Sequence, residues 1–209
     1  MCAESLIVPE PGNEIGRKPP IPITTARLIL RRFHTGDWKD LLEFLSDEEL
    51  FTYVEGAPME EERIIRWLQA DSHVRLTTPN EAFCLGMEVQ ESSKLIGYLS
   101  LWFTDPQRSQ AVINLFVNRS FQRMGFATEA VAGVIDFCFT GIKLHRVTAV
   151  CDSRNVAVRR LIEKAGMRRE GEFLKDKFLN GEWRDSIWYA LLDEEYRGRT
   201  SNPPLKSSA

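Results

Sequence analysis

Hydrophobic and polar residues follow two different spacings along most of this chain. Alternating or continuous apolar runs, which are typical of strands, occupy seven segments. These segments are 27–31, 82–89, 95–103, 110–117, 145–151, 167–177 and 183–192. Apolar positions three and four residues apart, which are typical of amphipathic helices, occupy four further segments. These segments are 37–45, 58–68, 127–139 and 155–165.

The order of these elements is strand, two helices, three strands, helix, strand, helix and two strands. The polar segment 90–94 and the Asn180-Gly181 pair favour tight hairpins between neighbouring strands. A chain that mixes strands and helices in this order folds as a sheet covered by helices. The pattern therefore predicts an α/β fold with a mixed sheet.

Length and composition are those of one globular domain. The chain has 209 residues, of which 43% are hydrophobic and 27% are charged, and this is enough to form a buried core. Residues 1–23 are rich in proline and poor in large apolar side chains, so we expect a flexible leader there. Residues 197–209 have a similar composition, and we expect a flexible tail. The folded domain is predicted at 24–196.

Charge and cysteine spacing argue against several classes of protein. The formal net charge of −3 argues against a nucleic-acid partner, a class that only paired arginines such as Arg31-Arg32 favour. The four cysteines are far apart and irregularly spaced, so we expect reduced thiols and no metal site. The chain has neither a long apolar run nor a secretory signal pattern, which predicts a cytoplasmic protein without a membrane partner.

The heptapeptide 122–128, Gln-Arg-Met-Gly-Phe-Ala-Thr, lies between an apolar strand and an apolar helix. The first N–H groups of a helix have no intrahelical acceptor, and the helix dipole is positive there, so such a turn can bind an anion. Gly125 leaves space for a phosphate beside the backbone, and Arg123 adds a positive charge. We interpret the segment as a pyrophosphate-binding loop. It is neither a Walker loop nor a Rossmann fingerprint, and the alternative is an ordinary strand-turn-helix connection.

This heptapeptide resembles the [QR]-x-x-G-x-[GA] loop that binds acyl-CoA in the GCN5-related N-acetyltransferases (GNAT). Gln122, Gly125 and Ala127 occupy its three defining positions, and Thr128-Glu129-Ala130 looks like the subgroup that acetylates ribosomal-protein N-termini (RimJ/RimL-like). The resemblance implies the GNAT fold, with a mainly antiparallel sheet of six to seven strands. It also implies acetyl-CoA as co-substrate. The residues implied in cofactor binding are Phe116, Val117, Gln122, Arg123, Met124, Gly125, Phe126, Ala127, Thr128 and Asn155.

Two later segments extend the resemblance. Residues 155–167 are similar to the motif N-x-x-S-x-x-(apolar)-x-x-K-x-G-(apolar), with Val158 at the serine position, so a proton-donating serine is missing there. Asn155 fits either a cofactor ligand or the N-cap of the following helix. Residues 180–185 are similar to the closing N-G-x-[WYF]-x-D hairpin of the ribosomal-protein subgroup. We expect Asp185 to be structural.

Acyl transfer from a thioester to a primary amine needs a deprotonated amine, donors for the oxyanion and no covalent enzyme intermediate. Backbone N–H groups near Phe116 and Val117 are the expected donors. Relatives often carry a glutamate in the preceding strand, but Val112 and Asn114 stand there, so the general base is unassigned. Asn114, as a ligand of water, and Tyr98, as a proton donor, are weak catalytic candidates.

The sequence indicates less about the acceptor amine than about the co-substrate. Residues 51–58 lie where relatives shape the acceptor groove, and Glu55 suits a cationic amine. An α-amine with a pKa near 8 is easier to deprotonate than a lysine, which favours a peptide N-terminus or a small α-amine. Val112 and Val158 leave a non-catalytic CoA-binding or sensor module as the alternative. The assembly is expected to be a monomer or a homodimer.

Overall fold

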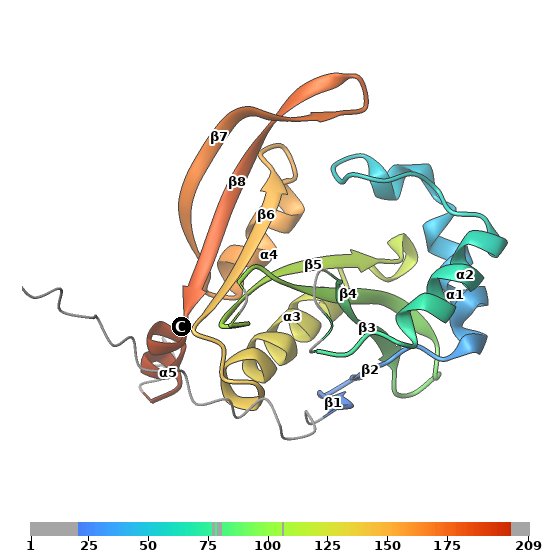
Figure 1. Cartoon of the computed structure of the whole chain (residues 1–209), viewed down its shortest axis with the longest axis horizontal. Coiled ribbons are helices and arrows are strands. Elements are labelled where there is room, and N and C mark those ends of the chain that lie inside the picture. The colour runs from blue at the N-terminus through green and yellow to red at the C-terminus, as the bar shows by residue number, and fades with distance from the viewer. Residues whose placement is uncertain (1–20, 77, 79–80, 106, 202–209) are drawn as a thin grey trace, which may run out of the picture.

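The computed structural model describes residues 21–76, 78, 81–105 and 107–201 (Figure 1). Residues 1–20 of the predicted leader and 202–209 of the predicted tail lie outside the described residues. The described part is one sheet with helices against it, in the strand order β1-β2-β3-β4-β5-β6-β8-β7. The strands are β1 Ile23–Thr24, β2 Leu28–Arg31, β3 Phe83–Val89, β4 Leu95–Phe103, β5 Gln110–Val117, β6 Arg146–Asp152, β7 Arg168–Leu179 and β8 Glu182–Leu192.

The sheet confirms the predicted mixed, mainly antiparallel architecture. Strands β5 and β6 form its parallel pair, and the other neighbouring strands are antiparallel. The described sheet has eight strands where six to seven were expected. The additional strand is β1, in which only Ile23 and Thr24 pair with β2. Two residues are too few to produce a hydrophobic period, so the sequence pattern gave no sign of this strand.

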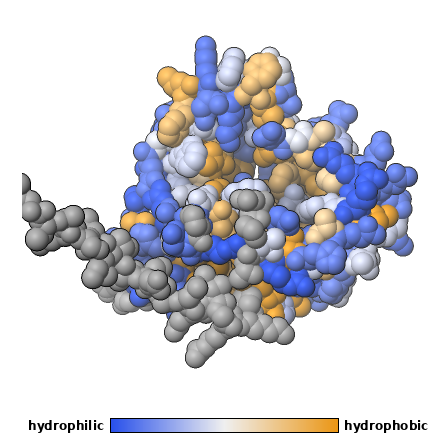
Figure 2. All heavy atoms as spheres, in the orientation of Figure 1, coloured by the Kyte–Doolittle hydropathy of each residue, from blue (hydrophilic) through white to orange (hydrophobic). Residues whose placement is uncertain are grey.

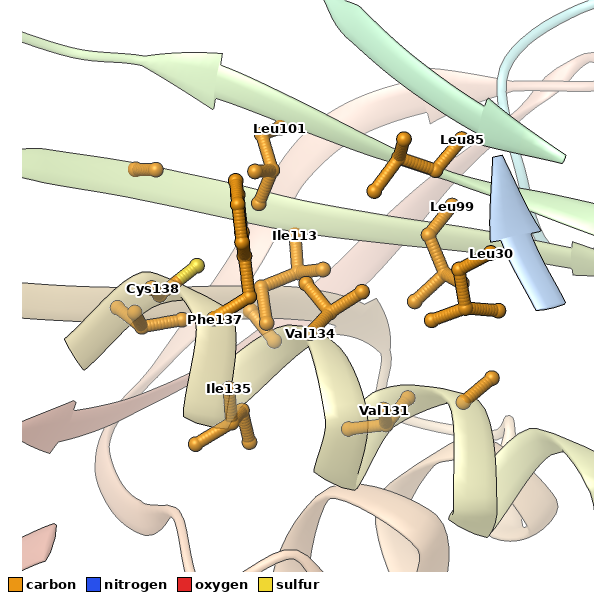
Figure 3. Packing of buried hydrophobic residues seen from close by; sticks show 14 of the residues in the cluster. Leu30, Leu85, Leu99, Leu101, Ile113, Val131, Val134, Ile135, Phe137 and Cys138 are labelled. Carbon is orange, nitrogen blue, oxygen red and sulfur yellow. The ribbon is translucent and has the colours of Figure 1, made fainter. Parts of the chain in front are cut away.

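The main helices cover both faces of the sheet. They are α1 Trp38–Leu45, α2 Glu61–Asp71, α3 Phe126–Asp136, α4 Val156–Lys164 and α5 Asp193–Ser201. Helix α3 packs with Val131 and Val134 against Leu30, Leu99 and Ile113 of the sheet (Figure 3). Helices α1 and α2 form a second core on the opposite face. That core contains Leu41, Phe44, Leu45, Ile64, Leu68 and Leu95.

Helix α5 continues past residue 196, where the sequence pattern ended the domain. It was not predicted because it lacks an apolar stripe: its described part is mostly charged. Polar contacts such as the Arg168–Glu195 ion pair attach it to the domain, together with one aromatic side chain. The Tyr196 ring stacks on Phe139 with 5.1 Å between centroids, and its hydroxyl donates to Asp136 at 2.6 Å. No helix among the described residues has the length and apolarity that crossing a membrane requires.

Candidate active site

Strands β5 and β6 pair over only three residues and then separate. Residues Gln110–Val112 are in register with Arg146–Thr148, whereas β5 stays paired with β4 as far as Val117. The edge of β5 that faces β6 is therefore open from Ile113 onwards. Figure 1 shows the two strands diverging, with helix α3 crossing below them. An open edge in the middle of a sheet offers unpaired backbone groups to an extended ligand.

Hydrogen-bond alternation decides which N–H groups point to this open edge. The Asn118 N–H donates to the Ile96 carbonyl at 2.8 Å, and the Thr104 N–H donates to the Gln110 carbonyl at 3.2 Å. The even-numbered residues of β5 therefore bond to β4, and the odd-numbered residues face β6. Val117 keeps its predicted position at the open edge. Phe116 was also expected to offer its N–H to a ligand, but this N–H bonds to β4 and points away from the open edge.

A cavity of about 520 Å³ fills the space between the diverging strands. Register partners share a face of the sheet, so the lining divides into two sides. The side toward α3 and α4, here called the helix side, includes Ile113, Leu115, Val131, Asn155, Val158 and Leu161. The opposite side, here called the hairpin side, includes Tyr53, Val54, Glu55, Ser100, Asn114, Asp152, Lys177, Arg184 and Ser186.

The β7–β8 hairpin and the loop after α1 close the cavity from above. Asn180 at the hairpin tip donates from its Nδ2 to the Phe51 carbonyl at 3.5 Å. In Figure 2 the surface is indented between the hairpin and the α1–α2 side. Apolar side chains are exposed at the hairpin tip, with Phe178 63% and Trp183 59% accessible to solvent. The hairpin side is thus assembled from segments far apart in the sequence.

Loop 122–128 has the backbone that a phosphate-binding turn requires. Arg123 and Gly125 both have left-handed φ angles, 62° and 84°, and Gly125 is the N-cap of α3. The first N–H groups of α3 therefore point out of the helix end without intrahelical acceptors. Gln122 stabilises the turn, because its Nε2 donates to the Val117 carbonyl at 3.0 Å. Met124 is exposed at the tip of the turn.

Arg27, which the sequence reasoning missed, holds this loop from the start of β2. Its Nη1 donates to the Met124 carbonyl at 3.0 Å, its Nε pairs with Glu129 at 2.8 Å, and its guanidinium lies 4.3 Å from the Phe126 ring centre. Burial acts against ionisation of Glu129, but hydrogen bonds from Thr25 and Arg27 hold the pKa of that carboxyl below its ordinary value. Nothing in the sequence around Arg27 indicated this contact, since 97 residues separate it from Met124.

Asn155 serves as the N-cap of α4 and also lines the helix side of the cavity. Its side-chain oxygen accepts from the Val158 N–H at 3.2 Å. Both interpretations of Asn155 therefore remain compatible with its position. Val158, at the place of the missing serine, lines the same side of the cavity.

The two weak catalytic candidates occupy different environments. Asn114 is exposed on the hairpin side, directly opposite Ser100 on β4. Tyr98 is packed among aromatic rings: it stacks on Phe116 at 5.0 Å and lies 5.2 Å from Trp67 between centroids. Burial raises the pKa of the Tyr98 phenol, so it stays protonated. Tyr98 is not among the described residues that line the cavity, and its position is that of a core residue.

A charged network on the hairpin side escaped the sequence reasoning. Asp152 is buried and pairs with Arg154 at 3.0 Å and with Arg184 at 3.5 Å. Glu182 binds the same two arginines. Asp185, which also lines the cavity, accepts with its Oδ1 from the Lys175 N–H at 2.7 Å where β7 shifts register, and this contact fits the expected structural role.

Neither a reactive thiol nor a metal cluster is present among the described residues. Burial raises the pKa of Cys84 to about 12 and that of Cys151, which lines the cavity, to about 11. Burial also raises the pKa of Cys138. Thiols with such pKa values are neutral near pH 7 and are poor nucleophiles. No group of three or more His, Cys, Asp or Glu gathers within the described ranges.

Comparison with known proteins identifies the family. The family model of the acetyltransferase (GNAT) domain matches residues 27–168. The chain belongs to the GNAT acetyltransferase family. It is 31% identical over 175 residues to the uncharacterized N-acetyltransferase YnaD of Bacillus subtilis, covering 83% of this chain and 98% of that one. The resemblance inferred from the 122–128 motif and the predicted enzyme class, an acyltransferase, are confirmed.

Two solved structures show the same fold. The spermidine N-acetyltransferase of Vibrio cholerae in complex with CoA and spermine has a TM-score of 0.71 at 22% identity, covering 82% of this chain and 98% of that one. RimL, a ribosomal L7/L12 alpha-N-protein acetyltransferase in complex with CoA, has a TM-score of 0.73 at 19% identity, covering 84% and 98%. Identities this low establish the fold and leave the acceptor open.

Proposed function

We propose that this protein transfers the acetyl group of acetyl-CoA to a primary amine inside the cavity between β5 and β6. The observation that carries the proposal is the alignment of three features. The turn at 122–128 leads into the start of α3, Gln122 joins this turn to Val117 at the end of the open β5 edge, and the cavity adjoins that edge. The family contains proteins that bind CoA and proteins that acetylate amines, which supports the same chemistry here.

Each part of the site has a task in holding the co-substrate. The N–H groups at the start of α3 and the Arg123 guanidinium suit the pyrophosphate. The odd-numbered backbone groups of β5, at Leu115 and Val117, suit the amides of an extended pantetheine arm, in the manner of an added strand. Asn155 and Val158 border the arm on the helix side. An N–H group of this open β5 edge takes the role of the oxyanion donor that was expected near Phe116 and Val117.

The chemical step is direct attack. The neutral amine forms a bond to the acetyl carbon, the carbon–sulfur bond breaks, and the amine loses a proton as the thiolate leaves. Asn114 and Ser100, opposite each other on the hairpin side, can hold a water that receives this proton. The raised pKa of Cys151 argues against an acyl-enzyme.

The acceptor is a small α-amine or a peptide N-terminus. An α-amine has a pKa near 8, against about 10.4 for a lysine side chain, so more of it is neutral near pH 7. This matters in a cavity that contains no carboxylate on β5. Glu55, exposed on the hairpin side, suits the incoming ammonium. The Thr128-Glu129-Ala130 similarity to the ribosomal-protein subgroup points the same way.

The test is thiol release from acetyl-CoA with a panel of amines. The panel contains amino acids, their amides, short peptides, spermidine and a blocked lysine with a free side chain. Release that depends on the amine, with the acetylated product seen by mass spectrometry, supports the proposal. Tight CoA binding without turnover of any amine would instead favour the CoA-binding sensor module.

A further inference from the structure

Lys177 and Arg184 form a like-charge pair on the wall of the cavity. They are register partners on β7 and β8, so their side chains lie next to each other on the same face of the hairpin. Both line the hairpin side of the cavity. Two cations directly opposite each other on paired strands repel, which makes this position unfavourable unless an anion lies beside them.

The ion pairs of this wall involve Arg184 and leave out Lys177. Asp152 and Glu182 each bind both Arg154 and Arg184, so these four residues form a network with two positive and two negative charges. Lys177 is left over, because it forms no ion pair with any described residue. Asp185 also lines the cavity, but its Oδ1 accepts from the Lys175 N–H, and the Lys177 ammonium has no carboxylate within ion-pair distance among the described residues.

Arg184 also has a donor without an acceptor. Its side chain is only 11% exposed, and its two terminal nitrogens are used by Asp152 and Glu182. The Nε–H is buried and has no hydrogen-bond partner among the described residues. A buried donor left without a partner costs free energy. Because this atom has almost no accessible surface, a ligand in the cavity meets the positive charge of the guanidinium and not this donor.

We infer that Lys177 and Arg184 bind a carboxylate of the acceptor, so that the acceptor carries a carboxylate close to its reactive amine. The inference deepens the proposed function and rests on it. A carboxylate in the cavity can pair with the Lys177 ammonium and is further attracted by the positive charge of Arg184 beside it. Glu55, on the wall formed by residues 53–55, forms no ion pair with a described residue and suits the amine of the same molecule. Lys177 and Glu55 can thus bind the two opposite charges of a zwitterion.

Two sources of such a carboxylate need separate arms of the experiment. The first arm compares free amino acids with the corresponding amino-acid amides, with each kcat/KM expressed per neutral amine because the two amines differ in pKa. The second arm compares peptides with glutamate at the second position and peptides with glutamine there. Spermidine serves as the acceptor without a carboxylate. Thiol release gives kcat/KM for each acceptor in the wild type, in Lys177→Met, and in the control Lys175→Met. Lys175 lies two residues away on β7 and is not among the residues lining the cavity.

The expected result is a preference of about tenfold or more for the carboxylate member in at least one arm. Lys177→Met should remove most of that preference while changing kcat/KM for the amide or glutamine member by less than about twofold. Lys177→Glu should reverse the preference toward spermidine. Lys175→Met should behave like the wild type.

Two outcomes would overturn the inference. One is a wild type that acetylates amides, glutamine peptides or spermidine as well as the carboxylate acceptors; the proposed acetyl transfer then stands and the carboxylate subsite falls. The other is a Lys177→Met variant in which kcat/KM falls by the same factor for every acceptor. Absence of turnover with every amine, while CoA still binds, removes the proposed function and this inference together. Circular dichroism of each variant separates these results from misfolding.

Discussion

The loop that we propose to bind the cofactor phosphates and the wall that we propose to face the acceptor are built in different ways. Loop 122–128 is one contiguous segment, and the φ angles of Arg123 and Gly125 define its shape. The hairpin side combines residues from the loop after η3 Glu48–Phe51, from β4 to β6 and from the β7–β8 hairpin. A site that lies in one contiguous segment can be found as a short sequence motif. The second kind depends on strand register and long-range contacts.

This difference has a functional consequence. A contiguous loop can bind the same diphosphate in many relatives, because its backbone groups do the binding. The hairpin side can change its charge through single side chains, such as Lys177 and Glu55, without disturbing that loop. Specificity for the acceptor can therefore diverge while the cofactor site stays the same. The predictions below separate the two regions.

The largest effect is expected for Gly125→Glu. The new side chain would extend from a left-handed position beside Arg27 and bring a negative charge to the start of α3. Loss of two charge-assisted contacts predicts at least about a hundredfold lower affinity for CoA in calorimetry. Gly181→Glu is the matched control, because Gly181 has a similar φ of 81° at the hairpin tip. A folded Gly125→Glu protein with normal CoA affinity would contradict the placement of the loop.

The same contrast explains which parts of the molecule were predictable. The sheet and its main helices follow from hydrophobic period and turn residues, and Gly125 is visible as part of a short motif. The pairing of Lys177 with Arg184 is not visible, because a register shift between Phe173 and Lys177 sets it. Within that shift the Lys175 N–H donates to Asp185, ten residues away. A pattern of apolar positions contains no such information.

Arg123→Ala should give the next largest effect. Arg123 forms no ion pair with a described residue, so its charge is available to a phosphate. A lost charge-assisted contact of about 1.5–3 kcal/mol predicts a CoA affinity lower by about 10- to 100-fold, and the loss should shrink as salt is added. Pantetheine without phosphates should bind the variant and the wild type equally.

The control for Arg123 lies four residues away. Arg119 already binds Asp47 at 3.2 Å and Glu49 at 2.6 Å, so its charge is compensated. Arg119→Ala should therefore change CoA affinity by less than about threefold. Similar losses for Arg119→Ala and Arg123→Ala would show that general positive charge, and not the loop, attracts the cofactor.

The pH dependence should report the acceptor amine. Below the pKa of an α-amine, near 8, each pH unit should raise kcat/KM about tenfold, because only the neutral amine attacks. The rate should then level off above that pKa. Cys84 and Cys151 have raised pKa values of about 12 and 11, so both thiols stay protonated through this range and add no step to the profile. An acceptor with a lysine-like amine should show the same profile displaced to higher pH.

The smallest effect is expected for Cys151→Ala, and it tests the mechanism most directly. Cys151 is the one described cysteine that lines the cavity, so it is the thiol that an acyl-enzyme mechanism would use. Its raised pKa means that less than about one molecule in a thousand carries the thiolate at pH 7, so it contributes little as a nucleophile. Turnover of the variant should stay within about threefold of the wild type. Cys138→Ala, in the core away from the cavity, is the control for lost packing. A rate that continues to rise toward pH 11 in the wild type and disappears only in Cys151→Ala would replace direct attack by an acyl-enzyme. An acetylated Cys151 peptide after mixing with acetyl-CoA alone would lead to the same conclusion.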